Sequence, residues 1–169
     1  MKIRTLLIIL ILLTICLMAC VVASDPIPAP PKENYLEFTL NGQIWKADNG
    51  IFGSYHFSEA LGPKLIQISG NKGNGSMQQS FNINLFHTAD EGEYVINLQN
   101  DQKSVAQLAN FTPSNYLCGG TFQAHHIKVK IIKVEKNPQH VEATFSGSMQ
   151  CVEGNQIQIT NGKFYYHEN

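Results

Sequence analysis

Apolar and polar residues alternate along much of the chain, with the period of two that is typical of half-buried β-strands. In FNINLF, the apolar residues Phe81, Ile83 and Leu85 are separated by asparagines. The same alternation recurs in EYVINL and in HVEATFSGSM, where the serine hydroxyls are expected to face solvent. Turn residues separate these short runs. The pattern predicts an all-β fold, an antiparallel β-sandwich or partly open barrel with at most one short helix.

The turns and the irregular positions add detail to this sheet prediction. Asn41-Gly42 lies between two β-prone runs and tolerates positive φ at both positions, which predicts a tight hairpin. In TFQAHHIKVKIIKV the apolar phase changes, which predicts β-bulges near His125-His126 and near Ile131-Ile132. The connection EKNPQH then predicts a long hairpin, and the last strands are expected around Asn161-Gly162.

One segment, DQKSVAQLANF, is compatible with a helix. Val105, Leu108 and Phe111 have helical spacing, and Asp101 or Ser104 could cap the first turn. This is the only place where we expect the short helix.

The N-terminus has the layout of an export signal: Lys2 and Arg4, then an unbroken apolar run, then small residues. Its end, Leu17-Met18-Ala19-Cys20, has the lipobox order of an apolar residue, a small residue and cysteine. We therefore expect a signal peptide over residues 1–19 and lipid attachment at Cys20. Cleavage after Ala23 and a retained membrane span are the alternatives. The missing basic stop and the break at Ser24-Asp25-Pro26 argue against the span.

The residues after Cys20 predict a tether followed by one domain. Residues 20–34 contain four prolines and no apolar periodicity, so we expect an extended Pro-rich tether. Residues 35–169 are then expected to form a single β-sandwich domain, long enough to bury a core.

The charge excludes nucleic acid as a partner. Removal of Lys2 and Arg4 leaves 12 − 2 = 10 basic residues against 13 acidic ones, a net charge near −3. No arginine follows position 4. Nucleic-acid binders need a basic surface, and bidentate phosphate or carboxylate clamps favour arginine.

The cysteines and histidines give no metal or cofactor prediction. Cys118 and Cys151 either form one disulfide or stay separate thiols, and the sequence leaves both open. His125 and His126 are neighbours on a strand, so they face opposite ways unless a bulge turns them together. The remaining histidines are isolated in the sequence, and no zinc-type spacing occurs. We expect no metal site and no cofactor.

Catalytic motifs are also missing from the sequence. There is no Gly-x-Ser-x-Gly elbow, and the glycine-rich SGNKGNGS lacks the lysine and serine or threonine order of a phosphate loop. We therefore expect a protein that is not an enzyme. An envelope hydrolase with a site assembled across loops is the alternative.

The aromatic residues allow two interpretations. Trp45 is expected to be a core anchor behind the first hairpin. If some of them faced outward, the aromatic residues could instead form a platform for sugars or peptides; the candidates are Trp45, Tyr55, Phe57, Tyr165 and Tyr166.

Several of these segments together resemble a known family. The lipobox, FTLNGQIWKA, GEYVI and VEATFSGSM with QIQITNGKF are similar to a family of small Bacteroidota lipoproteins of unknown function. The resemblance implies an exported, lipid-anchored β-sandwich without assigned catalytic residues. ATFSGS departs from the family's usual Gly-Thr-Phe strand, and the two domain cysteines are not typical of every member.

The function predicted from the sequence is a non-catalytic binding or interaction module of the cell envelope. Its membrane partner is reached through the N-terminal lipid, and its ligand is a glycan, a peptide or another envelope protein. The stretch VVASDP after Cys20 has only one acidic residue, Asp25, whereas surface-exported lipoproteins of this phylum carry an acidic run there. We therefore expect an outer-membrane lipoprotein that faces the periplasm.

Overall fold

The structure is a computed structural model that describes residues 32–58, 62–86, 90–97, 104–121 and 123–169. The predicted signal peptide, the lipidation residue Cys20 and most of the predicted tether lie outside these residues. Residues Glu33–Asn169 form one compact unit. Asn34, the last residue of the predicted tether, already contacts this unit: its side chain accepts a hydrogen bond from the His167 backbone N–H (2.8 Å) and donates one to the His167 carbonyl (3.2 Å).

The described residues form antiparallel strands and one turn of 3₁₀-helix, η1 (Gly75–Met77). In chain order the strands are β1 (Tyr35–Leu40), β2 (Gln43–Lys46), β3 (Asn49–Ser58), β4 (Gly62–Lys72), β5 (Gln79–Phe86), β6 (Gly92–Asn97), β7 (Val105–Ala109), β8 (Leu117–Gly119), β9 (His125–Lys136), β10 (Gln139–Gln150) and β11 (Gln156–His167). No helix among these residues is long and apolar enough to cross a membrane.

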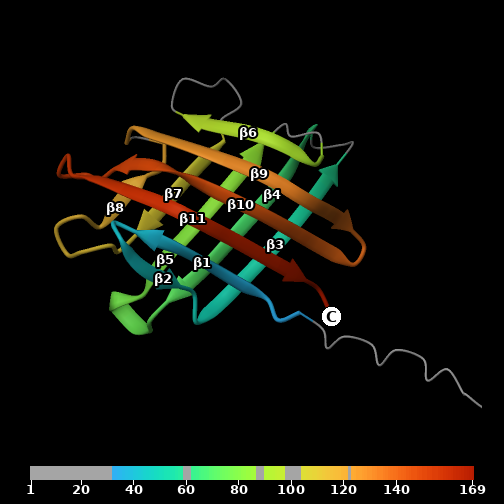
Figure 1. Cartoon of the computed structure of the whole chain (residues 1–169), viewed down its shortest axis with the longest axis horizontal. Helices are drawn as coiled ribbons and strands as arrows, with labels where there is room; N and C mark the ends of the chain where they lie inside the picture. Colours follow the sequence, from blue (N-terminus) through green and yellow to red (C-terminus); the bar gives the residue numbers. More distant parts are fainter. Residues whose placement is uncertain (1–31, 59–61, 87–89, 98–103, 122) are drawn as a thin grey trace, which may run out of the picture. The chain divides into compact units, whose positions relative to one another are not determined.

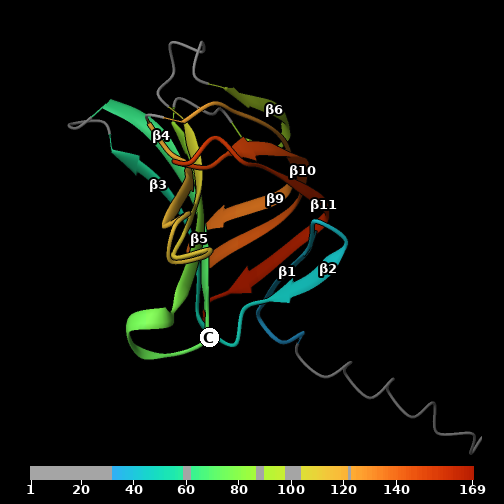
Figure 2. The same cartoon turned by 90° about the vertical axis from the view of Figure 1, so that its left-hand side faces the viewer.

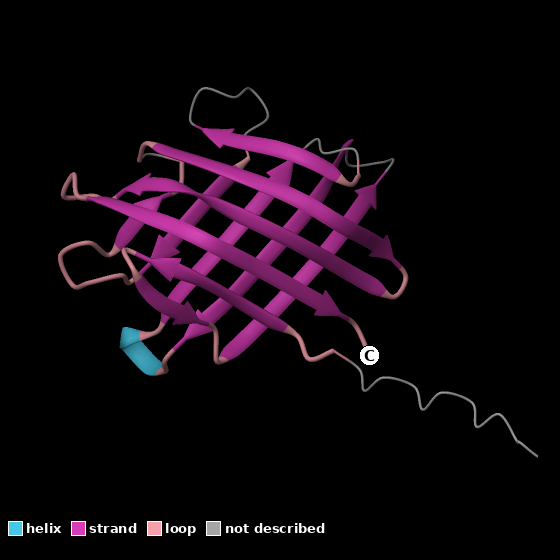
Figure 3. Cartoon of the chain, in the orientation of Figure 1, coloured by secondary structure: helices cyan, strands magenta, loops and turns pink. Residues whose placement is uncertain are grey.

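The strands form two sheets that pack face to face, which confirms the predicted sandwich. The six-stranded sheet has the order β2-β1-β11-β10-β9-β6, and the five-stranded sheet has the order β3-β4-β5-β7-β8. Figures 1 and 3 show the strands of one sheet running across those of the other, and Figure 2 shows the two layers from the side. Alternate side chains of both sheets meet in one apolar core, which includes Leu36, Ile66, Phe81, Ile127 and Phe164.

The first hairpin forms as predicted. Asn41 and Gly42 have φ angles of 47° and 84° and join β1 to β2, with Leu40 paired to Gln43. The turn places Trp45 in the core, where it is 2% exposed and stacks on Phe38 with ring centroids 4.6 Å apart. The indole N–H finds a partner in the Gln79 side-chain oxygen at 2.7 Å. Trp45 is therefore a core anchor.

Of the two bulges predicted in β9, one is confirmed and one is wrong. Glu142 and Ala143 of β10 pair with Lys133 and Ile131, so Ile132 is the extra residue of a bulge. At the other position, His125 is buried and His126 is exposed in regular alternation. No bulge is needed there, because the strand begins at His125 and the residues before it belong to a connection rather than to β9.

The helix alternative for DQKSVAQLANF is wrong over its described part. Residues 105–109 form strand β7, which pairs with β5 on one side and β8 on the other. Ala106 and Leu108 point into the core while their neighbours are partly exposed. Without β7, strand β5 would be left at an unpaired edge, so the tertiary pairing overrides the helical spacing.

Asn161-Gly162 lies inside a single strand rather than between two. Both neighbours of β11 slip by one residue here: Phe145 pairs with Gly162 but Gly147 pairs with Ile159, and a matching slip occurs on the β1 side. Asn161 has a φ of 55°. The dipeptide therefore forms a bulge, which re-aims side chains locally on the outer face of the sheet.

Candidate functional site

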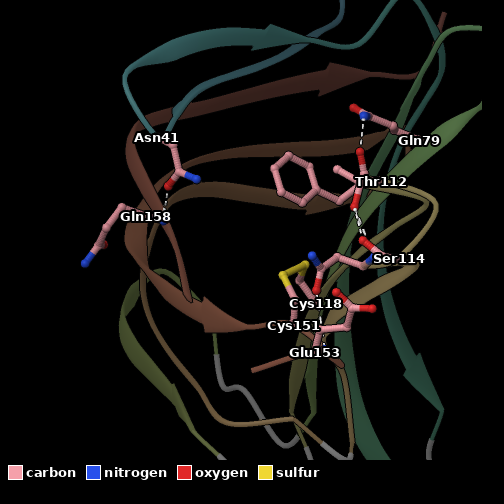
Figure 4. Close-up of a disulfide and its surroundings, with 10 residues drawn as sticks. Asn41, Gln79, Thr112, Ser114, Cys118, Cys151, Glu153 and Gln158 are labelled. Carbon is pink, nitrogen blue, oxygen red and sulfur yellow. Dashed lines mark hydrogen bonds between the residues drawn. A yellow bond between two sulfur atoms is a disulfide. The ribbon is translucent and has the colours of Figure 1, made fainter. Parts of the chain in front are cut away.

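Cys118 and Cys151 form a disulfide, one of the two possibilities that the sequence left open. Cys118 lies in β8 of the five-stranded sheet, and Cys151 directly follows β10 of the six-stranded sheet. Both are fully buried. Figure 4 shows the bond beside Thr112, Ser114 and Glu153. The bridge thus links the two sheets, and it leaves neither cysteine as a free thiol for chemistry.

The histidines are arranged differently from what their sequence positions suggested. His125 and His126 face opposite sides of the sheet, so they do not converge on one ion. His140 and His167, isolated in the sequence, have ring centroids 5.3 Å apart because β10 and β11 pair. His140 also lies 3.3 Å from Glu135. Within the described residues, no group of three or more His, Cys, Asp or Glu side chains could hold a metal ion.

A polar cluster ties the turn before β6 to the other sheet. The Tyr55 hydroxyl donates to Asp90 at 2.8 Å, and the Lys64 ammonium lies 3.2 Å from the same carboxylate. These hydrogen bonds, first from Tyr55 and then from Lys64, lower the pKa of Asp90. Burial, followed by the hydrogen bond to Asp90, raises the pKa of Tyr55. The hydroxyl therefore stays protonated at neutral pH, which suits a structural tie rather than a nucleophile.

Two hollows lie along strand β10 on the outer face of the six-stranded sheet. The larger has a volume of about 970 Å³ and lies over β6, β9, β10 and β11. A smaller hollow of about 390 Å³ lies further along β9 and β10, where His126 and Ser148 line it. We call the two together the β10 groove. Its floor is formed by Thr144, Ser146 and Ser148 of β10, and its walls by His126, Lys128 and Lys130 of β9 and by Asn161 and Lys163 of β11.

The groove arises from a difference in side-chain length between neighbouring strands. Ser146 pairs with Lys128, and Thr144 pairs with Lys130 on one side and Lys163 on the other. These outward side chains stand beside each other in rows, since paired residues on one face have Cβ atoms about 5 Å apart. Short hydroxyl side chains thus lie between long lysines. The bulge at Asn161 adds a polar amide to the wall.

The groove is cationic although the chain as a whole is slightly acidic. Its lining contains Lys128, Lys130 and Lys163 and one carboxylate, Glu93, which lies 3.8 Å from Lys130. In the described part of the chain, neither Lys128 nor Lys163 forms a salt bridge. Glu37 of β1 lies opposite Lys163 in the β1–β11 ladder, but the two side chains form no ion pair. The formal charge of the lining is therefore +2, against −1 for the whole chain.

The outer face of the five-stranded sheet differs from the groove because its centre is neutral. Amides and hydroxyls of neighbouring strands bond to one another: the Ser54 hydroxyl lies 3.0 Å from the Gln67 side-chain oxygen, and Gln67 donates to Asn84 at 3.4 Å. These three side chains are hydrogen-bonded to one another. In the β10 groove, no hydrogen bond or salt bridge within the described part of the chain involves the Lys128 and Lys163 ammonium groups, whereas Lys130 lies 3.8 Å from Glu93.

The aromatic platform, the alternative interpretation of these residues, does not form among the described side chains. Trp45 is buried, and Tyr55 belongs to the cluster with Asp90. Tyr165 lies next to Tyr35 on the outer face of the six-stranded sheet, with ring centroids 6.1 Å apart. Tyr166 packs against the core from the other side of the same strand. The side chain of Phe57 lies outside the described residues. These aromatic residues therefore share no common face.

The outward direction of the serines was predicted from the sequence, whereas the lysines around them were not part of that prediction. Lys128 and Lys130 alternate with Ile127, Val129 and Ile131, so their outward direction was readable from the sequence. Their meeting with Lys163 was not, because it depends on the register of three strands. Comparison of the chain with family models, curated proteins and solved structures gives no match. The functional assignment therefore depends on the residues of this chain.

Proposed function

We propose that the protein is a lipid-anchored, non-catalytic binding module of the cell envelope that holds its ligand in the β10 groove. The observation that carries the proposal is the groove itself: lysine, hydroxyl and amide groups converge over a hollow of about 970 Å³. They stand on strands β9, β10 and β11, which are paired on both sides. Binding groups on such elements are held more precisely than groups on loops.

The chemistry of the groove favours recognition over hydrolysis. Glycoside hydrolysis needs two carboxyl groups across the bond that is cut, and the larger hollow is lined by one, Glu93, at its rim beside Lys130. Serine hydrolysis needs a base within hydrogen-bond reach of the serine. Ser146 is paired with Lys128, and Ser148 is paired with His126. Within the described residues no hydrogen bond joins either serine side chain to its partner, and no carboxylate lines the smaller hollow to complete a catalytic triad. This arrangement favours a binding surface.

The proposed cellular location is based on the sequence. The order Leu17-Met18-Ala19-Cys20 supports lipid attachment at Cys20, and the single Asp25 after it supports a periplasm-facing position at the outer membrane. The likeness to small Bacteroidota lipoproteins points the same way. The proline content between Cys20 and the domain is typical of an extended spacer, which spans about 3 Å per residue in polyproline form.

Replacing Cys20 by serine is expected to abolish lipid attachment, because a hydroxyl does not substitute for the thiol that takes the diacylglycerol. The measurement is incorporation of labelled palmitate by the full chain in a diderm bacterial host, together with recovery in the membrane fraction. Cys16→Ser is the matched control, since Cys16 lies inside the predicted signal peptide and labelling should persist. Labelling of the Cys20→Ser variant would show that the anchor is assigned to the wrong residue.

Filling the groove is expected to abolish ligand binding without unfolding the domain. Ser146→Trp places a large ring on the floor of the groove at an exposed position. The matched control is Ser80→Trp on β5, which points outward from the opposite sheet. The full-chain protein in nanodiscs is tested against immobilised glycans and peptides. At least a tenfold loss of binding affinity is expected for Ser146→Trp, and no loss is expected for Ser80→Trp. If both variants bind like the unmodified protein, the ligand site lies elsewhere.

A further inference from the structure

We infer that the ligand of the β10 groove is an acidic glycan, a sugar chain that carries carboxylate groups. This inference rests on the proposed function, because it names the ligand class of the same groove. It follows from three features of the groove: the spacing of its charges, the groups on its floor and the position of the groove within the sheet.

The lysines are spaced for a ligand with repeated negative charges. Lys128 and Lys130 are two residues apart on β9, a distance of about 7 Å between their Cα atoms. Lys130 and Lys163 stand on either side of Thr144, two strand spacings or about 10 Å apart. A small anion contacts one or two ammonium groups at this spacing. A chain with a carboxylate on successive units meets all three.

The floor of the groove suits sugar hydroxyls. The Thr144, Ser146 and Ser148 hydroxyls each donate and accept hydrogen bonds, and the Asn161 amide does both with separate atoms. Sugars present the same pairs of donors and acceptors. Many phosphate sites use backbone N–H groups at a helix N-terminus, and within the described residues no helix lines the groove. Its lysine ammonium groups bind carboxylates as point charges.

The place of the groove within the sheet argues against an acidic peptide. Peptides often bind by adding a strand to an open sheet edge, where main-chain hydrogen bonds give affinity. The strands that carry the three lysines and the floor hydroxyls are interior: β11 is flanked by β1, and β9 is flanked by β6, the edge strand at the rim of the groove. Their main-chain groups are used within the sheet. The interior strands of the groove therefore offer side-chain groups and no open main-chain edge.

The shape of the groove argues against an anionic membrane surface. The hydroxyls of Thr144, Ser146 and Ser148 lie between rows of longer side chains, including the three lysines. A flat array of headgroups would reach the lysine tips and leave the floor empty. A single chain can enter the groove and use both sets of groups.

The test measures binding of defined probes to the full-chain protein in nanodiscs of zwitterionic lipid by calorimetry. The probes are oligogalacturonate, the same oligosaccharide after reduction of its carboxyl groups, a poly-glutamate peptide and, by vesicle flotation, phosphatidylglycerol vesicles. Oligogalacturonate is expected to bind, and reduction of its carboxyl groups should lower the binding affinity at least tenfold. Lys128→Gln and Lys163→Gln should each weaken it about five- to tenfold, as expected for the loss of a charge-assisted hydrogen bond. Lys72→Gln, at an exposed position at the end of β4, is the matched control and should bind as the unmodified protein does.

Each other outcome overturns a stated part of the proposal. Equal binding of the carboxyl-reduced sugar, blocked by Ser146→Trp, overturns the acidic-glycan inference and leaves the proposed binding function standing. Stronger, groove-dependent binding of poly-glutamate or of the vesicles also overturns the inference and assigns the groove to that ligand. If Ser146→Trp affects no probe and no member of the glycan and peptide panel, the inference and the proposed function both fail. Thermal unfolding of each variant shows whether a loss reflects the groove or the fold.

Discussion

Replacing Cys118 and Cys151 together by alanine is expected to lower the free energy of unfolding by about 3–4 kcal/mol. The two residues are separated by 33 positions, and closing a loop of that length reduces the entropy of the unfolded chain by roughly this amount. The bridge also joins the end of β10 to β8, so its loss frees the edge of the five-stranded sheet. For a domain of this size, the unfolding midpoint should fall by about 10 °C.

The measurement is thermal unfolding followed by circular dichroism. The unmodified protein incubated with a strong reductant is the control, because it loses the cross-link and keeps both sulfur atoms in the core. A midpoint equal to that of the reduced protein assigns the effect to the cross-link. An additional fall in the alanine variant measures the packing of the two sulfurs. A midpoint within about 2 °C of the oxidised protein would contradict the structural role of the bridge.

Gly147→Ala is expected to destabilise the domain by about 3 kcal/mol, the upper part of the range for overpacking a filled site. Gly147 has a φ of 152°, and a Cβ added there would overlap the carbonyl oxygen of His126 and lie 2.8 Å from the Cα of Ile127. Both atoms belong to the backbone of β9. β9 is held between β10 and β6, so its backbone cannot move aside to make room for the added methyl group.

The measurement is urea unfolding, compared with that of Ser148→Ala. Ser148 is the next residue along β10 and lies on the outer face, so its loss should change the free energy of unfolding by less than about 0.5 kcal/mol. If Gly147→Ala is as stable as Ser148→Ala, then β9 and β10 are not in the close register described above.

The fold was predictable because local patterns determine most of it. The alternation around Phe81 and the turn at Asn41-Gly42 each need only a few neighbouring residues, and both agree with the structure. Two local interpretations were wrong for different reasons. The spacing around Leu108 is compatible with a helix, but this segment pairs with β5 as a strand. At His125 a bulge was predicted, but strand β9 begins there instead.

The groove was not predictable, because it depends on which strands become neighbours. Lys130 and Lys163 are more than thirty residues apart in the chain and meet across Thr144 only once the register of three strands is fixed. The same applies to Tyr55 with Asp90, which are 35 residues apart in the chain. The asparagine-glycine pairs show the limit most clearly: at Asn41 the dipeptide makes a turn, whereas at Asn161 it makes a bulge inside a strand.

The way the chain enters the domain at Asn34 has a mechanical consequence. β1 runs antiparallel to β11 from Tyr35 onward, and Asn34 holds the far end of β11 through His167. If the chain is tethered before Asn34 while a ligand is held in the groove, a pull along β1 shears the ladder between β1 and β11. In shear, the hydrogen bonds of the ladder share the load instead of opening one after another. A tether before Asn34 would therefore load this ladder in shear and would not peel it open from one end.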